Sequence, residues 1–182
     1  MNSFLKSVVT FGATLACAWS HAETTSYWDP ALRAEKSADC TVLTAGTRTM
    51  NSGWYVVRGE VSCVNLSVSG TVNLILADGA RLTAAGEYRH AGIAVLQHDT
   101  LTIWGQSGGT GELTAVGGEW ASGIGGNEYE FGCDGGTVTV NGGTVRATGG
   151  RCAAGIGGGN QGSCGRVTVN AGQVFATAGE NY

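Results

Sequence analysis

The chain has 182 residues, and 10 Lys and Arg against 14 Asp and Glu give it a formal net charge of −4. Proteins that bind nucleic acids need clustered basic residues to neutralise phosphates, so this acidic, lysine-poor composition argues against a nucleic-acid partner. The length fits one domain.

The first 22 residues have the layout of a secretory signal peptide. Lys6 supplies a positive start, residues 7–19 form an uncharged and mainly apolar stretch, and small residues precede a cleavage point before Glu23. This stretch is too short to span a membrane comfortably, and no later stretch is long and apolar enough to do so. We therefore expect a secreted or cell-surface protein, periplasmic or extracellular. The alternative is a lipoprotein, because Cys17 ends a segment that resembles a lipoprotein cleavage box.

Residues 23–52 do not follow the pattern of the rest of the chain. Asp29 and Pro30 are suited to the start of a short helix that runs to Glu35, and residues 37–51 are mostly polar. A repeat protein needs an atypical terminal segment to cover its open end. We expect residues 23–52 to form an N-terminal cap.

Short β-strands separated by turns are expected from residue 53 to the end of the chain. Residues 72–83 read as a strand, an Asp-Gly turn and a second strand, and residues 100–104 alternate between polar and apolar. Of the 32 glycines, 24 lie at or beyond Gly105, where they separate short β-branched runs. No segment here has helical periodicity, so we expect an all-β domain over residues 53–182.

The sequence repeats itself with a period of about 30 residues. Residues 136–150 and 165–179 are identical at ten of fifteen positions at an offset of 29. Residues 113–126 and 145–158 agree at eight of fourteen positions at an offset of 32. Self-similarity of this kind is typical of stacked arrays.

Each repeat predicts two or three short strands joined by glycine corners. Alternation places Val138 and Val140 on one face of a strand, and Ile156 is expected to point inward from a third, thinner side. We predict a single-stranded parallel β-helix in which Val138 lies over Val167 and Asn141 lies over Asn170. A β-sandwich, the main alternative, also needs many short strands but does not predict a repeat of this length.

Five cysteines remain after removal of the signal peptide, and an oxidising compartment favours disulfides between them. Cys40 and Cys63 flank the cap and the first coil, and Cys133 and Cys164 occupy corresponding loops of adjacent coils. One coil spacing is within reach of a disulfide, so we expect Cys40–Cys63 and Cys133–Cys164, with Cys152 left over. No C-x-x-C pair is present, and we expect no metal site.

Three segments carry a resemblance to a known group of proteins. GIGG at 123–126, GIGGG at 155–159 and TVTVNGGTVRATGG at 137–150 resemble the units of glycine-rich repeat proteins on bacterial surfaces, which carry GAGIGGG and GTITINGGTVTATGG. The likeness covers residues 53–179. It implies a β-helical, surface-exposed protein, in some cases described as carbohydrate-binding, and it offers no catalytic residues to transfer.

Motifs for catalysis and cofactor binding are incomplete. Residues 105–109 fit G-x-S-x-G, but no helix follows and both histidines of the mature chain precede the serine. Residues 157–162 fit G-x-G-x-x-G without the helix that would hold a pyrophosphate. Glu128, Glu130 and Asp134 are expected to form a solvated acidic loop, and Ca²⁺ binding through their oxygens is the alternative. We therefore expect no enzyme activity and no cofactor, and a degenerate polysaccharide lyase or hydrolase is the enzymatic alternative.

Binding of a glycan by exposed aromatic rings is the most specific function that the sequence favours. The partner is expected to be a polysaccharide or a host or cell-surface glycan. The contact residues that we expect are Trp104, Trp120, Tyr129 and Phe131, which are close together in the sequence. The last residues stop where another GIGGG element is due, so we also expect further repeats or a partner there. On that view, the chain is a passenger fragment of a longer surface protein.

Overall fold

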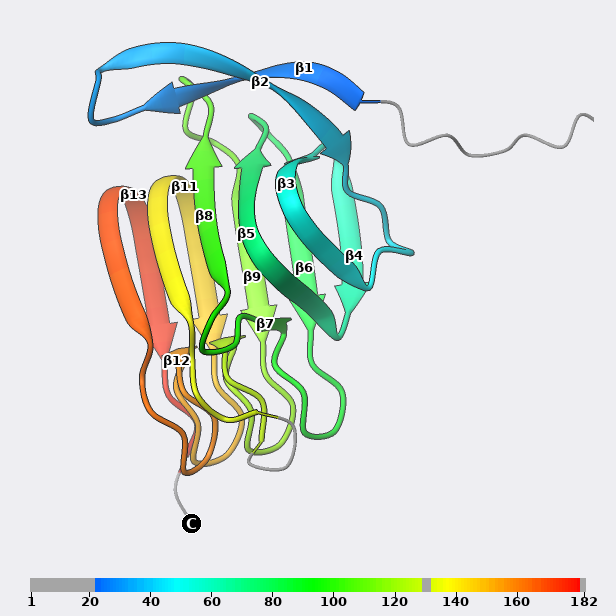
Figure 1. The fold of residues 1–182 in the computed structure, drawn as a ribbon, viewed down its shortest axis with the longest axis vertical. Coiled ribbons are helices and arrows are strands. Elements are labelled where there is room, and N and C mark those ends of the chain that lie inside the picture. The colour runs from blue at the N-terminus through cyan, green and yellow to red at the C-terminus, as the bar shows by residue number, and fades with distance from the viewer. Residues whose placement is uncertain (1–21, 129–131, 181–182) are drawn as a thin grey trace, which may run out of the picture.

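The computed structural model describes residues 22–128 and 132–180. These residues form an all-β fold without a helix, in which thirteen strands join in one mixed sheet that curls on itself (Figure 1). The strands are β1 (Ala22–Asp29), β2 (Ala34–Val42), β3 (Thr49–Val57), β4 (Glu60–Val64), β5 (Leu66–Leu76), β6 (Arg81–Ala85), β7 (Ile93–Ala94), β8 (Thr100–Gly105), β9 (Glu112–Val116), β10 (Ile124–Gly125), β11 (Thr137–Thr148), β12 (Ile156–Gly157) and β13 (Arg166–Thr177). None of the described segments forms a helix with the length and apolar character needed to cross a membrane.

Strand pairing places successive segments of the chain on three faces, which we name A, B and C. Neighbours on each face pair in parallel, and the chain visits C, then A, then B before it starts the next round. Face A consists of residues 53–57, 71–76, 100–105, 137–140 and 166–169. Face B consists of β4, β6, β9 and residues 144–148 and 173–177. Face C consists of residues 49–51 and 66–69 with β7, β10 and β12.

The register confirms the columns that the repeat predicts. Val138 pairs with Val167, and Val140 pairs with Val169. On face C, Ile124 pairs with Ile156. Apolar side chains at alternate positions therefore stack from one round of the chain to the next. Their burial removes apolar surface from water at every level and forms the core.

The core is closed along most of the stack and open at its last round. Val138 and Val140 are 2% and 0% exposed, whereas Val167 and Val169, in the same columns on β13, are 43% and 50% exposed. The same residue type in the same register thus has two environments, which differ only in whether another layer covers it.

The N-terminal segment contains a β-hairpin, so the helix expected after Asp29 is wrong. Strands β1 and β2 pair antiparallel, with Trp28 opposite Glu35. The Asp29 carboxylate accepts hydrogen bonds from the backbone N–H of Ala31 and Leu32, 3.0 and 3.1 Å away, which is the same interaction that caps a helix. Here it stabilises a turn, because the following residues pair with β1.

The hairpin lies across the ends of the strands at one side of the molecule (Figure 1). Strand β2 continues into a short parallel pairing with β3, and Leu43 is buried next to it. Strand β3 spans the boundary expected between the cap and the repeats, because its residues from Thr49 already pair with β5. The first round of the chain therefore begins inside the segment 23–52.

Neither expected disulfide is present in the structure, where Cys40, Cys63, Cys133, Cys152 and Cys164 are all free thiols. The two buried thiols are directed at different backbone carbonyls. The Cys40 thiol donates to the oxygen of Ala38 at 3.4 Å, and the Cys63 thiol donates to that of Thr44 at 3.5 Å. Burial raises the pKa of both thiols above the usual value.

Cysteine labelling is expected to separate the five thiols into two classes. Cys40 and Cys63 are 0% and 1% exposed, and their raised pKa leaves little thiolate at neutral pH. In the reduced, folded protein, iodoacetamide should modify them at least about a hundredfold more slowly than the other three, because reaction requires local opening. Peptide mapping by mass spectrometry measures these rates. Unfolding in guanidinium should remove the difference, and a Cys40–Cys63 bond in unreduced protein would contradict the structure.

Candidate functional site

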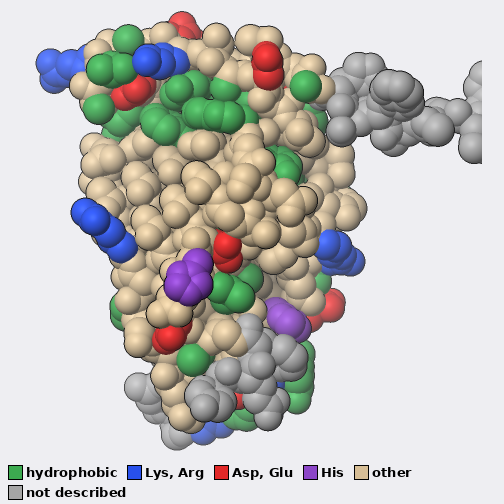
Figure 2. All heavy atoms as spheres, in the orientation of Figure 1, with side chains coloured by type: hydrophobic (Ala, Val, Ile, Leu, Met, Phe, Trp, Pro, Cys, Tyr) green, Lys and Arg blue, Asp and Glu red, His purple; other side chains and the backbone are tan. Residues whose placement is uncertain are grey.

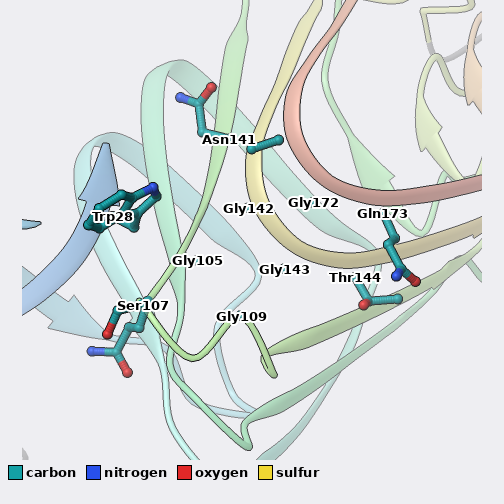
Figure 3. Close-up of a pocket in the computed structure, with 12 residues that line it drawn as sticks. Trp28, Gly105, Ser107, Gly109, Asn141, Gly142, Gly143, Thr144, Gly172 and Gln173 are labelled. Atoms are coloured by element: carbon teal, nitrogen blue, oxygen red, sulfur yellow. The ribbon is translucent and has the colours of Figure 1, made fainter. Parts of the chain in front are cut away.

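A cleft of about 430 Å³ lies at the corner between faces A and B, beside the hairpin (Figure 3). Three successive rounds of the chain contribute corresponding corner segments to it, and Trp28 of β1 contributes an indole. Figure 3 shows Trp28 on one side of the cleft and Thr144 and Gln173 on the other. The lining residues are Trp28, Gly105, Gln106, Ser107, Gly109, Asn141, Gly142, Gly143, Thr144, Ala171, Gly172 and Gln173.

Glycine is required at this corner because adjacent rounds of the chain approach closely. A Cβ atom on Gly105 would lie 2.8 Å from the backbone nitrogen of Gly143. Gly172 has a φ of +88°, and a Cβ there would lie 2.5 Å from the oxygen of Gly143. The wall of the cleft is therefore backbone, with few side chains projecting into it.

Amide and hydroxyl groups supply the polar part of the lining. The Asn170 amide donates to the Oδ1 atom of Asn141 at 2.8 Å, so the expected contact between these two side chains is present. The backbone register nevertheless pairs Asn141 with Ala171, because the strands shift by one residue at the corner. On the far side of the corner, Thr144 pairs with Gln173. None of the twelve lining residues carries a formal charge.

Alternation along β1 determines where Trp28 lies. Its neighbour Tyr27 points the other way and is 8% exposed, and its ring centroid is 4.8 Å from those of Trp54 and Trp104. Burial is the main reason that the pKa of the Tyr27 hydroxyl is raised. This aromatic cluster anchors the hairpin on face A, and Trp28, which is 36% exposed, is left at the cleft.

Gln106 joins the hairpin to the loop below it. Its Nε2 atom donates to the backbone oxygen of Ser26 at 3.0 Å, and its Oε1 atom accepts from the backbone N–H of Asp78 at 2.9 Å. The carboxylate of Asp78 in turn accepts from the backbone N–H groups of Gly108 and Thr110, at 3.0 and 3.1 Å. Because charged acceptors form strong hydrogen bonds, Asp78 holds the loop after β8 in place.

Of the four expected contact residues, the structure describes Trp104 and Trp120, and it places these two apart. Trp104 is part of the aromatic cluster, where its Nε1 atom donates to Oδ1 of Asn73 at 3.0 Å. Trp120 lies in the turn after β9, and Figure 1 shows that β9 ends on the side of the molecule away from the hairpin. The Arg89 guanidinium lies 4.7 Å from the ring centroid of Trp120. Tyr129 and Phe131 lie outside the described residues. Trp28, which sequence reasoning assigned to the cap, is the aromatic residue at the cleft.

The acidic loop is held by protein contacts at the positions that the structure describes. Glu128 lies 3.6 Å from the Arg89 guanidinium, and Asp134 accepts a hydrogen bond from the backbone N–H of Ser163 at 2.7 Å. Glu130 lies outside the described residues. Within residues 22–128 and 132–180, no three His, Cys, Asp or Glu side chains are grouped so that they could hold a metal ion.

The lining of the cleft combines an apolar surface with groups that can form hydrogen bonds. An indole provides a flat apolar surface, while amide groups can both donate and accept hydrogen bonds and hydroxyls can do the same. Its volume is within the range of small-ligand sites, about 300–1,000 Å³. Comparison of the chain with protein-family models, with curated proteins and with solved structures gives no match.

Proposed function

We propose that this protein is a non-enzymatic, secreted or surface-exposed repeat scaffold that binds a neutral carbohydrate in the cleft beside Trp28. The scaffold itself is proposed to be a single-stranded parallel β-helix, with residues 1–22 removed as a signal peptide. The parallel pairing on three faces and the period of about 30 residues support this architecture. The resemblance to glycine-rich repeat proteins supports the surface location.

The observation that carries the binding proposal is an exposed indole facing uncharged polar groups across a cleft. A sugar ring presents C–H groups on its faces and hydroxyls around its edge. The indole of Trp28 suits the C–H faces, and the side chains of Thr144 and Gln173 suit the hydroxyls. A charged ligand would lose hydration without gaining an opposite charge from the lining, so a neutral sugar is favoured.

Replacement of Trp28 by alanine is expected to weaken glycan binding by about 30-fold or more, because an aromatic anchor typically contributes about 2 kcal/mol or more. The ligand is first identified on an array that carries neutral and acidic glycans. Isothermal titration calorimetry of the mature chain then gives the affinities of wild type and variant. Since no lining side chain titrates, the affinity of the wild type should stay constant between about pH 5 and 8.

Trp120→Ala is the matched control, since it removes the same ring from the other end of the strands. This variant should bind as the wild type does, provided that circular dichroism shows both variants to be folded. The absence of binding to every glycan on the glycan array would contradict the proposal. So would a Trp120→Ala variant that loses binding while Trp28→Ala retains it, which would return the site to the aromatic residues favoured by the sequence.

A further inference from the structure

The outward side of face A carries threonines in a regular two-dimensional array. Outward positions alternate with the buried ones along each strand, and parallel pairing aligns them between strands. One column carries Thr71, Thr100 and Thr137 and ends at Arg166 on β13. The next carries Thr102, Thr139 and Thr168 and begins at Trp54 and Asn73 on β3 and β5. We call the six threonines the threonine array.

The backbone fixes the spacing of this array in both directions. Neighbouring strands are about 4.8 Å apart, and alternate residues of one strand are about 6.6–6.8 Å apart. Each strand of face A is hydrogen-bonded to its neighbours and lies on a packed core, so the hydroxyl and methyl groups are held at repeating positions.

The hydroxyls of the threonine array are available to a partner. No side-chain hydrogen bond joins any of the six to another described residue, whereas Thr49 bonds to Ser67 and Thr110 bonds to Asp78. Five of the six are partly buried, and Thr71 is exposed. Each hydroxyl can therefore still donate and accept.

Face B shows that the requirements of a β-strand do not by themselves produce this surface. Threonine is favoured in strands, and the outward positions of faces A and B have the same backbone environment. Yet face B has Glu60, Arg81 and Glu112 in one outward column, and Arg146 in the next. Figure 2 shows an uncharged band over the middle of this side of the molecule, with the charged side chains in view above it, below it and at its edges.

We propose that the threonine array of face A binds the surface of ice. A rigid, periodic array can be matched over its whole area only by a partner that is itself periodic. Hydroxyls both donate and accept, as water does, and they alternate here with methyl groups. A charged side chain would order water around itself in a different arrangement. The six threonines carry no charge, and Arg166 lies only at the end of one column, so the array is complementary to an uncharged lattice of water molecules. This proposal does not depend on the cleft beside Trp28.

The test measures ice growth in solutions of the mature protein. Single ice crystals in buffer should become faceted, and recrystallisation in a frozen sucrose solution should be inhibited. In the variant Thr102→Tyr, a large ring in the middle of the array should raise the inhibitory concentration about tenfold or more, since surface complementarity is lost. Thr114→Tyr is the matched control on the outward side of β9, and it should behave as the wild type does.

Melting curves establish that both variants are folded. Wild-type protein that neither facets ice nor inhibits recrystallisation at the concentrations where albumin is also inactive would overturn the proposal. Equal loss in Thr102→Tyr and Thr114→Tyr would overturn it as well, because the effect would then not belong to face A. Trp28→Ala should leave the ice activity unchanged, which separates this proposal from glycan binding.

Discussion

Val140→Ala is expected to lower the free energy of unfolding by about 2–3 kcal/mol, because the substitution removes two buried methyl groups and leaves a cavity. Val140 is fully buried on β11, between Ile103 of β8 and Val169 of β13. Because residues of three rounds of the chain meet at this point, the loss weakens contacts in both directions along the stack. Urea unfolding followed by tryptophan fluorescence measures the change.

Val169→Ala provides a control that differs only in burial. It removes the same two methyl groups from the same column, but its side chain is 50% exposed. The expected loss is within about 0.5 kcal/mol, as for ordinary surface substitutions. Equal losses at the two positions would show that the last round of the chain is covered in solution.

Gly125→Ala is expected to lower the free energy of unfolding by about 3 kcal/mol or more. A Cβ on Gly125 would lie 2.0 Å from the backbone oxygen of Gly157, the residue with which it pairs on face C. Its φ of +131° is also unfavourable for a side chain. Neither partner can move away without breaking the parallel pairing, so the strain is not relieved. Thermal and urea unfolding measure the loss.

The same substitution at Gly59 separates crowding from backbone conformation. Gly59 has a φ of +59°, and a Cβ there would meet no atom within 4 Å. Gly59→Ala should therefore cost only the conformational penalty, about 1–2 kcal/mol. If Gly59→Ala proved as damaging as Gly125→Ala, close approach between rounds of the chain would not be the reason for the glycines on face C.

The repeating part of the fold could be predicted because residues that contact one another are separated by a regular number of positions in the sequence. Val138 and Val167 are 29 positions apart and are neighbours in space, and the same holds for Val140 and Val169. Stacking places equivalent residues of successive repeats in contact, so sequence identity and spatial proximity coincide. Ile156 on the third side followed from the same regularity.

The hairpin and the cleft could not be predicted, because they have no counterpart elsewhere in the chain. Asp29 and Pro30 suit a turn as well as a helix start, and only the pairing of Trp28 with Glu35 decides between them. The position of Trp28 over the corner depends on contacts of Tyr27 with residues of two different rounds. The expectation that neighbouring aromatic residues gather at one site failed for Trp104 and Trp120. Trp104 lies near the end of β8, whereas Trp120 lies in the turn that follows β9, and these two strands run in opposite directions (Figure 1).

The hydrogen bond between Ser26 and Gln106 joins residues 80 positions apart, and this separation constrains the order of folding. The hairpin can form early from local contacts, but its docking must wait until β8 and the loop after it are in place. The cleft is therefore completed late, when the hairpin docks on corner segments that have folded separately from it. An incompletely folded molecule would display intact strands but no cleft. The proposed ligand affinity would therefore report on the final docking event, which secondary-structure spectroscopy alone would not detect.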